Sequence, residues 1–227
     1  MSTRVLYVTA TPEEAEALRR TMGIVNTGDY FRFGSLEIEL LVGGVGIMST
    51  AWTMAKWISV NKKPDIAINA GIAGSYLEIH PVGSVVMPVS DCFADAGIED
   101  GDKFINLHEA GLTGKDEFPF KNGYIICENR FSEEMKIIMN PVTAITVNTA
   151  TGSDKTRKRM AERYNPGIET MEGAAFFYIC AKENIPFMSV RSVSNIVEQR
   201  DRNRWNIPLA IDNLAFKLEE VDRKSVV

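Results

Sequence analysis

The sequence predicts an α/β fold, a three-layer sandwich in which helices cover both faces of a central mixed, largely parallel sheet. Apolar runs of strand length alternate with helical stretches along the chain. Most of these strand runs are apolar throughout, which is typical of strands buried on both faces. No internal repeat, low-complexity segment or linker interrupts residues 1–227, so a single domain is expected.

The predicted elements follow from hydrophobic periodicity and from turn residues. Strands are predicted at residues 4–9, 30–33, 36–42, 66–70, 84–89, 143–147 and 187–193. Helices are predicted at residues 11–22, 47–60, 132–139, 153–164, 172–183 and 205–221. Gly34-Ser35 indicates a hairpin turn, which makes the sheet mixed. Residues 93–121 show no clear period, and a long irregular stretch of this kind is usually functional or mobile.

Composition excludes several classes of function. Acidic residues outnumber basic ones by 30 to 25, and a net charge of −5 argues against a protein that binds nucleic-acid backbones. There is no apolar run of the length that crosses a membrane, and residues 1–4 lead straight into a strand without the features of a signal peptide. No nucleic-acid or membrane partner is therefore expected.

Cysteine and histidine usage indicates neither disulfides nor a metal. Cys92, Cys127 and Cys180 are scattered and odd in number, which suggests neither a disulfide framework nor a zinc site and favours a cytoplasmic location. His80 and His108 are too few for a metal cluster. We expect no metal and no cofactor.

Ligands of such sheets lie beyond the carboxyl ends of the strands, so chemistry is sought in the residues that follow each strand. After the first strand, Glu14 either completes a capping box with Thr11 or orients a water molecule. Glu172 is either an acid favoured by the helix dipole or a carboxylate that holds ribose hydroxyls, with Met171 packed against the sugar. Asn195 forms an Asx turn or binds a base edge, because its amide both donates and accepts.

Two glycine-rich segments are further candidates. Residues 43–49 approach a dinucleotide-binding motif but lack its last glycine and the expected acid after the next strand. Gly46 still precedes a helix N-terminus, where an anion or a sugar hydroxyl could bind. Residues 71–74, Gly-Ile-Ala-Gly, follow the fourth strand and form a tight turn or let the backbone approach a ligand closely.

Together these segments resemble one family. Glu14 after the first strand and four later motifs occur in the order seen in the purine nucleoside phosphorylase/nucleosidase superfamily: Gly44-Val45-Gly46, residues 69–74 (NAGIAG), residues 171–175 (MEGAA) and residues 190–195 (VRSVSN). The resemblance runs from about residue 4 to residue 221. It implies a nucleoside phosphorylase-like fold and cleavage of the bond between a purine and a ribose.

Within the superfamily the chain looks like a nucleosidase. Hexameric phosphorylases carry an arginine where this chain has Asn69, and a phosphate-binding Ser or Thr where it has Ile72. Without that arginine a phosphate dianion lacks its main partner, which makes water the expected nucleophile. Ser49 matches a phosphate-binding serine, so a phosphate-dependent phosphorylase stays an alternative.

Asn195 bears on the choice of base. Methylthioadenosine/S-adenosylhomocysteine nucleosidases have an Asp there that protonates adenine, and Asn cannot act as an acid. Asn195, the segment 200–202 and the segment 205–207 resemble futalosine hydrolases, which release hypoxanthine from futalosine and leave dehypoxanthine futalosine in menaquinone biosynthesis. The alternatives are an adenine-releasing nucleosidase and a non-catalytic nucleoside-binding protein.

The resemblance implies a role for each site residue toward a purine nucleoside. Glu14 is expected to be the general base, Glu172 to hold the ribose hydroxyls and Asn195 to bind the leaving base. The remaining substrate contacts are expected from Gly46, Ile72, Asn148, Thr149, Ala150 and Met171. A Phe from 93–121 and an arginine among residues 200–204 are candidates for a substrate carboxyphenyl arm. A homodimer or a higher homo-oligomer is expected, since in this family a neighbouring subunit can contribute to that pocket.

Overall fold

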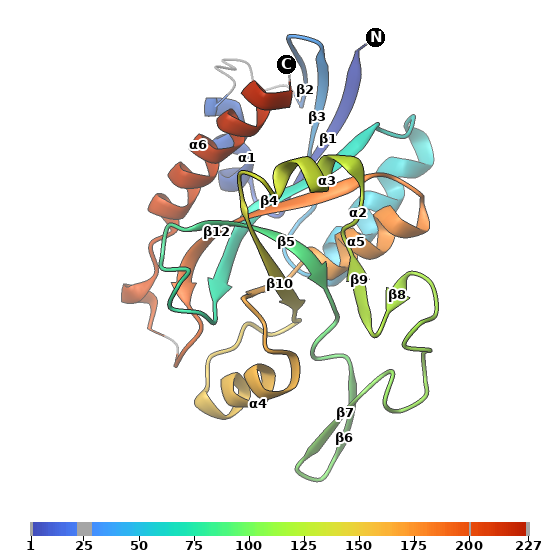
Figure 1. Ribbon diagram of the computed structural model, residues 1–227, viewed down its shortest axis with the longest axis vertical. Helices are drawn as coiled ribbons and strands as arrows, with labels where there is room; N and C mark the ends of the chain where they lie inside the picture. The colour runs from blue at the N-terminus through green and yellow to red at the C-terminus, as the bar shows by residue number, and fades with distance from the viewer. Residues whose placement is uncertain (1, 22–28, 200, 226–227) are drawn as a thin grey trace.

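A ten-stranded sheet lies at the centre of the computed structural model, which describes residues 2–21, 29–199 and 201–225 (Figure 1). Its strands are β1 (Thr3–Thr9), β2 (Tyr30–Phe33), β3 (Leu36–Val42), β4 (Ile66–Ser75), β5 (Val85–Asp91), β8 (Phe120–Lys121), β9 (Tyr124–Ile126), β10 (Asn140–Thr146), β11 (Ile168–Thr170) and β12 (Phe187–Ile196). The order is β2-β3-β1-β4-β11-β10-β5-β9-β8, and β12 pairs with both β4 and β5. A separate hairpin contains β6 (Gly97–Asp100) and β7 (Lys103–Asn106).

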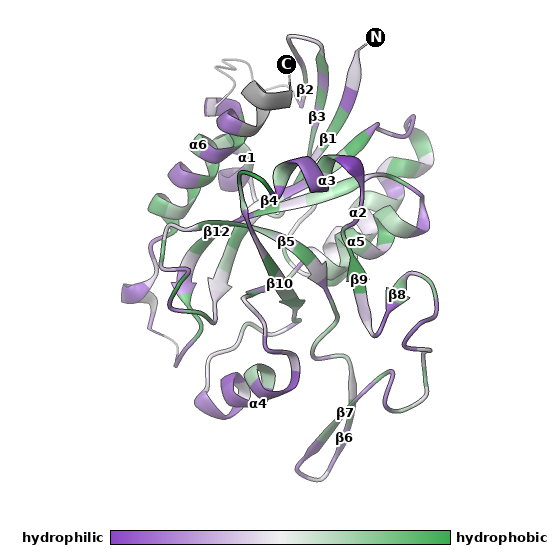
Figure 2. Cartoon of the chain, in the orientation of Figure 1, coloured by the Kyte–Doolittle hydropathy of each residue, from purple (hydrophilic) through white to green (hydrophobic). Residues whose placement is uncertain are grey.

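Helices cover both faces of this sheet. On one side α1 (Pro12–Thr21) packs against α6 (Ile207–Ser225), and on the other α2 (Ile47–Val60) packs against α5 (Gly173–Lys182) (Figure 1). The shorter α3 (Arg130–Met135) approaches β12, and α4 (Asp154–Tyr164) lies beyond the end of β10. Figure 2 shows α4 as mostly hydrophilic and α6 as a mixture of hydrophilic and hydrophobic residues, as expected of a helix with one buried face.

The predicted fold class is confirmed. The pairs of β1 with β3 and β4, of β4 with β12, and of β10 with β5 and β11 are parallel. The β2–β3 hairpin and the β8–β9 edge are antiparallel, so the sheet is mixed. No helix in the described ranges is long and apolar enough to span a membrane.

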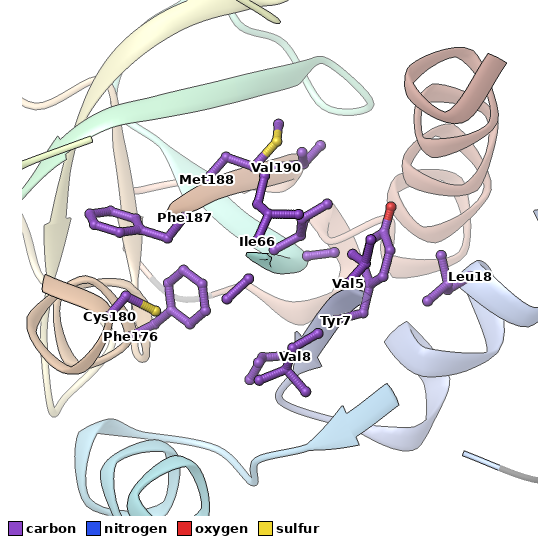
Figure 3. Close-up of a cluster of buried hydrophobic side chains, with 14 of the residues drawn as sticks. Val5, Tyr7, Val8, Leu18, Ile66, Phe176, Cys180, Phe187, Met188 and Val190 are labelled. Atoms are coloured by element: carbon purple, nitrogen blue, oxygen red, sulfur yellow. The ribbon is translucent and has the colours of Figure 1, made fainter. Parts of the chain in front are cut away.

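The main core lies between the sheet and the helices. Side chains from β1, β4, α5 and β12 meet there, and Figure 3 shows Tyr7, Ile66, Phe176 and Phe187 among them. All residues of β12 from Phe187 to Ser194 are buried. Burial on both faces explains why the apolar runs in the sequence are continuous and do not alternate.

The prediction that the fourth strand stops at residue 70 is wrong. β4 continues to Ser75 because it has pairing partners on both sides beyond residue 70. β12 pairs with it as far as Ser75, and β11 pairs with Gly74 and Ser75 from the other side. Residues 71–74 are thus strand and not a tight turn. Ile72, Ala73 and Gly74 line a pocket described below, and the close approach of this backbone to a ligand stays a prediction.

Other elements also differ from the predictions. β11 was not expected, because a strand of three residues carries no period of its own before α5 begins. The segment 93–121 contains the β6–β7 hairpin and β8 rather than being irregular throughout. α3 ends at Met135, four residues earlier than predicted, and β10 already begins at Asn140.

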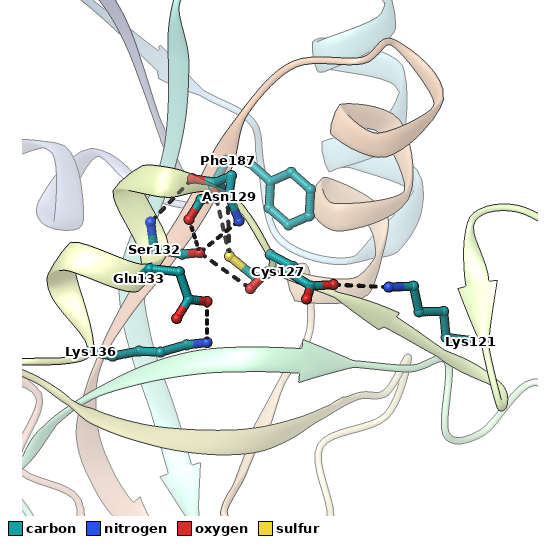
Figure 4. A network of polar contacts seen from close by, with 8 residues as sticks. Lys121, Cys127, Asn129, Ser132, Glu133, Lys136 and Phe187 are labelled. Carbon is teal, nitrogen blue, oxygen red and sulfur yellow. Dashed lines mark hydrogen bonds and ion pairs between the residues drawn. The ribbon is translucent and has the colours of Figure 1, made fainter.

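The start of α3 anchors the start of β12 (Figure 4). Asn129 and Ser132 form a capping box, in which each side chain accepts a hydrogen bond from the other residue's backbone N–H. The Asn129 amide also donates to the Phe187 carbonyl at 2.7 Å, and the Cys127 thiol donates to the same oxygen at 3.1 Å. The first residue of β12 is therefore held in place, with Asn195 at the other end of the strand.

Candidate active site

A pocket of about 350 Å³ lies at the carboxyl ends of β1, β4 and β12. Its wall is completed by the segments that enter α1, α5 and α6. Six of the nine predicted site residues line it: Glu14, Ile72, Ala150, Met171, Glu172 and Asn195. Gly46, Asn148 and Thr149 are not among the residues that line it. A larger cavity of about 570 Å³ beneath residues 92–124 contains none of them.

Glu14 is buried at the start of α1 and is bound by three backbone N–H groups. Thr11 N and Glu14 form the expected capping box, with distances of 3.0 Å to the carboxylate and 3.3 Å to the Thr11 hydroxyl. Ala10 N and Ile72 N also donate to the carboxylate, each at 2.9 Å. Glu14 therefore caps its helix and also joins β1 to β4 beside the pocket. Burial raises the pKa of its carboxyl, while the Arg191 charge and these backbone donors counter that rise.

Arg191 lies next to Glu14, although its place in the VRSVSN motif predicted no role for it. Its side chain on β12 is almost completely buried, and Nη2 donates to the Asn69 side-chain oxygen. Gly71 separates it from Glu14: a Cβ at Gly71 would stand 2.5 Å from Arg191 Nη1 and 2.6 Å from Glu14 Oε1. A glycine is required at this point of β4, because any side chain would displace one of the two charged groups.

Glu172 faces the pocket from the N-terminus of α5. It is 6% exposed, and its Oε1 accepts a hydrogen bond from Gly46 N at 3.0 Å. Gly46 has a φ of 94°, in the region that favours glycine, and this conformation belongs to the N-cap of α2. The glycine-rich turn before α2 thus orients the carboxylate of Glu172 through this hydrogen bond.

Asn195 occupies the pocket end of β12. Its side-chain oxygen accepts from the Ser194 hydroxyl at 2.9 Å, and its Nδ2 donates to the Ile196 carbonyl at 3.1 Å. An amide has two N–H donors and two acceptor lone pairs, so one of each is left for a ligand. The side chain is half-buried and fixed by its own strand.

Other residues singled out in the sequence lie elsewhere. The Asn148 and Thr149 backbones and the Asn148 amide are bound by Asp95, and neither residue is among those that line the pocket. Arg204 pairs with Glu198 at 2.7 Å, whereas Arg200 lies outside the described residues. No Phe of residues 93–121 lines the pocket; Phe93 and Phe120 line the larger cavity.

Another buried carboxyl, Asp91, lies beside Gly173 at the N-terminus of α5 and is not part of the pocket lining. It accepts hydrogen bonds from the Thr146 hydroxyl at 3.0 Å and from Cys92 N at 2.8 Å. Burial raises its pKa to about 7, against the lowering effects of Thr146 and Arg191. Nothing in the spacing of the sequence brings Asp91 next to Glu172, which comes much later in the chain.

Comparisons with known proteins identify the family of the chain. The model of the phosphorylase superfamily matches residues 4–221. A futalosine hydrolase of Streptomyces coelicolor is 30% identical over 179 residues, which are 76% of this chain and 73% of that protein. A 5'-methylthioadenosine/S-adenosylhomocysteine nucleosidase of Buchnera aphidicola is 26% identical over 78% of this chain and 75% of its own.

Among solved structures, a mutant of the Helicobacter pylori 5'-methylthioadenosine nucleosidase with 5'-methylthioadenosine in its active site superposes with a TM-score of 0.80. It is 14% identical and covers 99% of this chain and 100% of its own, so it shows the shared fold. The family model spans nearly the whole chain and the relatives extend over most of it. The chain therefore belongs to the phosphorylase superfamily and is an N-glycosyl hydrolase, a nucleosidase.

Proposed function

We propose that this nucleosidase hydrolyses futalosine to hypoxanthine and dehypoxanthine futalosine, a step of menaquinone biosynthesis. The observation that carries the proposal is Asn195, an amide and not an acid, at the pocket end of β12. An amide cannot protonate adenine, but it can donate to N7 and contact O6 of a 6-oxopurine. The Streptomyces coelicolor futalosine hydrolase, at 30% identity, supports the same substrate.

In the proposed reaction Glu172 holds the 2′- and 3′-hydroxyls of the ribose, and Met171 packs against the sugar. As the bond between C1′ and N9 lengthens, the electron pair of that bond leaves with the base. Positive charge therefore grows on the ribosyl group. A carboxylate 6% exposed and fixed by Gly46 N is suited to stabilise that charge. The Asn195 amide donates to N7 of the departing hypoxanthine anion, which then takes a proton from solvent water to give hypoxanthine.

Glu14 is the proposed general base. The attacking water gives its proton to the carboxylate, and its oxygen forms the new bond to C1′. The three backbone donors fix the orientation of this carboxylate, and a raised pKa makes it a stronger base than an exposed glutamate. Ile72 contributes through its backbone N–H, which binds Glu14.

The 5′ arm of the substrate is assigned to the side of the pocket formed by Trp205, Ile207 and Ile211.

We also propose that the protein is a homo-oligomer. Val45, just before α2, and Met48 and Trp52 within it are exposed apolar side chains, and Val45 lines the pocket. Apolar residues gathered on a surface are typical of interfaces between proteins, so a second copy would complete the site. We further propose that the chain acts as a single domain in the cytoplasm, where its three buried cysteines would stay reduced.

The test measures base release by chromatography from futalosine, inosine and methylthioadenosine, each with and without phosphate. Fast release of hypoxanthine from futalosine without phosphate is the expected result. A preference for methylthioadenosine would assign the chain to the adenine nucleosidases, as the Buchnera aphidicola relative suggests. A requirement for phosphate would make it a phosphorylase instead.

A further inference from the structure

One buried acid in the pocket wall has no part in the reaction described above. Glu169 of β11 lines the pocket and is 7% exposed. Among the described residues no Lys or Arg forms an ion pair with it. A buried carboxylate without a cation costs stability, and such groups gather at functional sites.

Three donors hold the Glu169 carboxylate in one orientation. Thr151 N donates to Oε1 at 2.8 Å, and the Thr151 hydroxyl donates to Oε2 at 2.6 Å. The Tyr76 hydroxyl also donates to Oε2, at 3.0 Å. Because an ionised carboxylate offers about four acceptor positions, one position on Oε1 is left for a donor that enters the pocket.

The sheet register places Glu169 opposite Asn195. Both residues are paired with Gly74, Glu169 from β11 and Asn195 from β12. Neighbouring strands lie about 4.8 Å apart, so the two backbones are separated by roughly 10 Å with one strand between them. Gly74 has no side chain of its own: a Cβ there would stand 2.8 Å from Val197 Cγ2 and 3.3 Å from Asn195 Nδ2, so the Asn195 amide lies close to this backbone. A purine with one hydrogen bond of about 2.9 Å at each edge spans this separation.

We propose that Glu169 is a specificity-determining residue that accepts the N1–H of a 6-oxopurine while Asn195 binds the N7 edge of the same ring. This inference rests on the proposed function. N1 of hypoxanthine carries a hydrogen, whereas N1 of adenine carries a lone pair. A carboxylate at this place therefore attracts the first base and repels the second, so it adds a repulsive element against adenine nucleosides.

The experiment compares kcat/KM on futalosine and on its adenine counterpart, which share the same sugar arm. Glu169→Gln keeps the shape of the side chain and replaces one acceptor oxygen by a donor NH2. The ratio of hypoxanthine to adenine activity is expected to fall at least tenfold. Glu13→Gln is the matched control, because Glu13 lines the same pocket but is exposed, and its ratio is expected to stay within about twofold of the wild type.

The outcomes separate this inference from the function on which it rests. A wild-type preference for the adenine nucleoside would overturn both. A wild-type preference for futalosine that Glu169→Gln retains would overturn the role of Glu169 alone. Calorimetry on the wild type gives a test without a variant: 1-methylhypoxanthine should bind at least tenfold more weakly than hypoxanthine, and equal affinities would refute the proposed contact.

Discussion

The carboxylate of Glu14 and the guanidinium of Arg191 approach each other over the bare backbone of Gly71. One point, where a Cβ of Gly71 would stand, lies within 2.6 Å of both side chains. Arg191 is buried and also bound to Asn69, so its guanidinium is held in place near Glu14. The proposed base therefore works beside a fixed cation, and the following predictions start from that pair.

Gly71→Ala should reduce kcat by about 10²-fold, because its methyl group displaces either Glu14 or Arg191 and a shift of about 1 Å in a reacting group has that effect. Gly43→Ala is the control: a Cβ there meets nothing closer than 3.5 Å. Steady-state kinetics on both variants check the prediction. Equal activities would show that the approach at Gly71 has no catalytic importance.

The pH dependence of kcat/KM should report Glu14. Its pKa is raised by burial, and only the ionised form accepts a proton, so activity should fall as pH decreases through that raised value. Arg191→Met removes a charge that lowers this pKa, so the acid limb should move to higher pH. Arg191→Lys keeps the charge and should move the limb less. An unchanged acid limb in Arg191→Met would mean that another group controls the profile.

Glu172→Gln should lower kcat by about 10²–10³-fold, since a neutral amide does not stabilise the positive ribosyl group. Gly46 N can still donate to the amide oxygen, so the thermal unfolding midpoint should change little. Glu13→Gln, on the exposed side of the same pocket, serves as the comparison in the same assay. Near-normal turnover by Glu172→Gln would remove this residue from the mechanism.

Asn195→Asp should raise activity on adenine nucleosides relative to hypoxanthine nucleosides, because a carboxylic acid can protonate adenine at N7. Asn203→Asp adds the same charge at an exposed position outside the pocket lining and should leave the ratio unchanged. Base release from inosine and adenosine measures the ratio. If base preference stays the same in Asn195→Asp, the amide does not contact the base.

Asp91 should make stability depend on pH. Its pKa is about 7 in the folded protein and near 4 when the chain is unfolded, so the folded state binds the extra proton between these values. Stability should therefore fall as pH rises from about 4 to about 7. Asp91→Asn removes the charge, so its unfolding midpoint relative to the wild type should be several degrees higher at pH 8 than at pH 5. A difference that does not vary with pH would contradict the raised pKa.

The local elements were predictable where the turn residues mark their ends. The β2–β3 hairpin and α2 have the predicted bounds, because Gly34 and Gly46 stand at their turns. β11 was missed because a strand so short has no period. The length of β4 was missed because its last residues pair with β11 and with the end of β12, which are distant in the sequence.

Predicted site residues that follow or end a strand were identifiable by position, as Glu14 after β1 and Asn195 near the end of β12 illustrate. Arg191 was not, since it lies inside a strand and its contact with Asn69 joins residues 122 positions apart. The register of Glu169 opposite Asn195 also depends on β4 between them. Such contacts follow from the order of strands in the sheet, which periodicity along the chain does not contain.

β4 also keeps the proposed general base and the proposed purine site at a constant distance from each other. Ile72 N binds the proposed base and Gly74 lies beneath the proposed purine, so both belong to one extended segment of backbone. Two residues of a strand are separated by roughly 6.6 Å, and neither rotamers nor loop movements change that distance. Substitutions in the surrounding loops can therefore alter which nucleoside binds. They leave the distance between the attacking water and the leaving base unchanged, because β4 sets that distance.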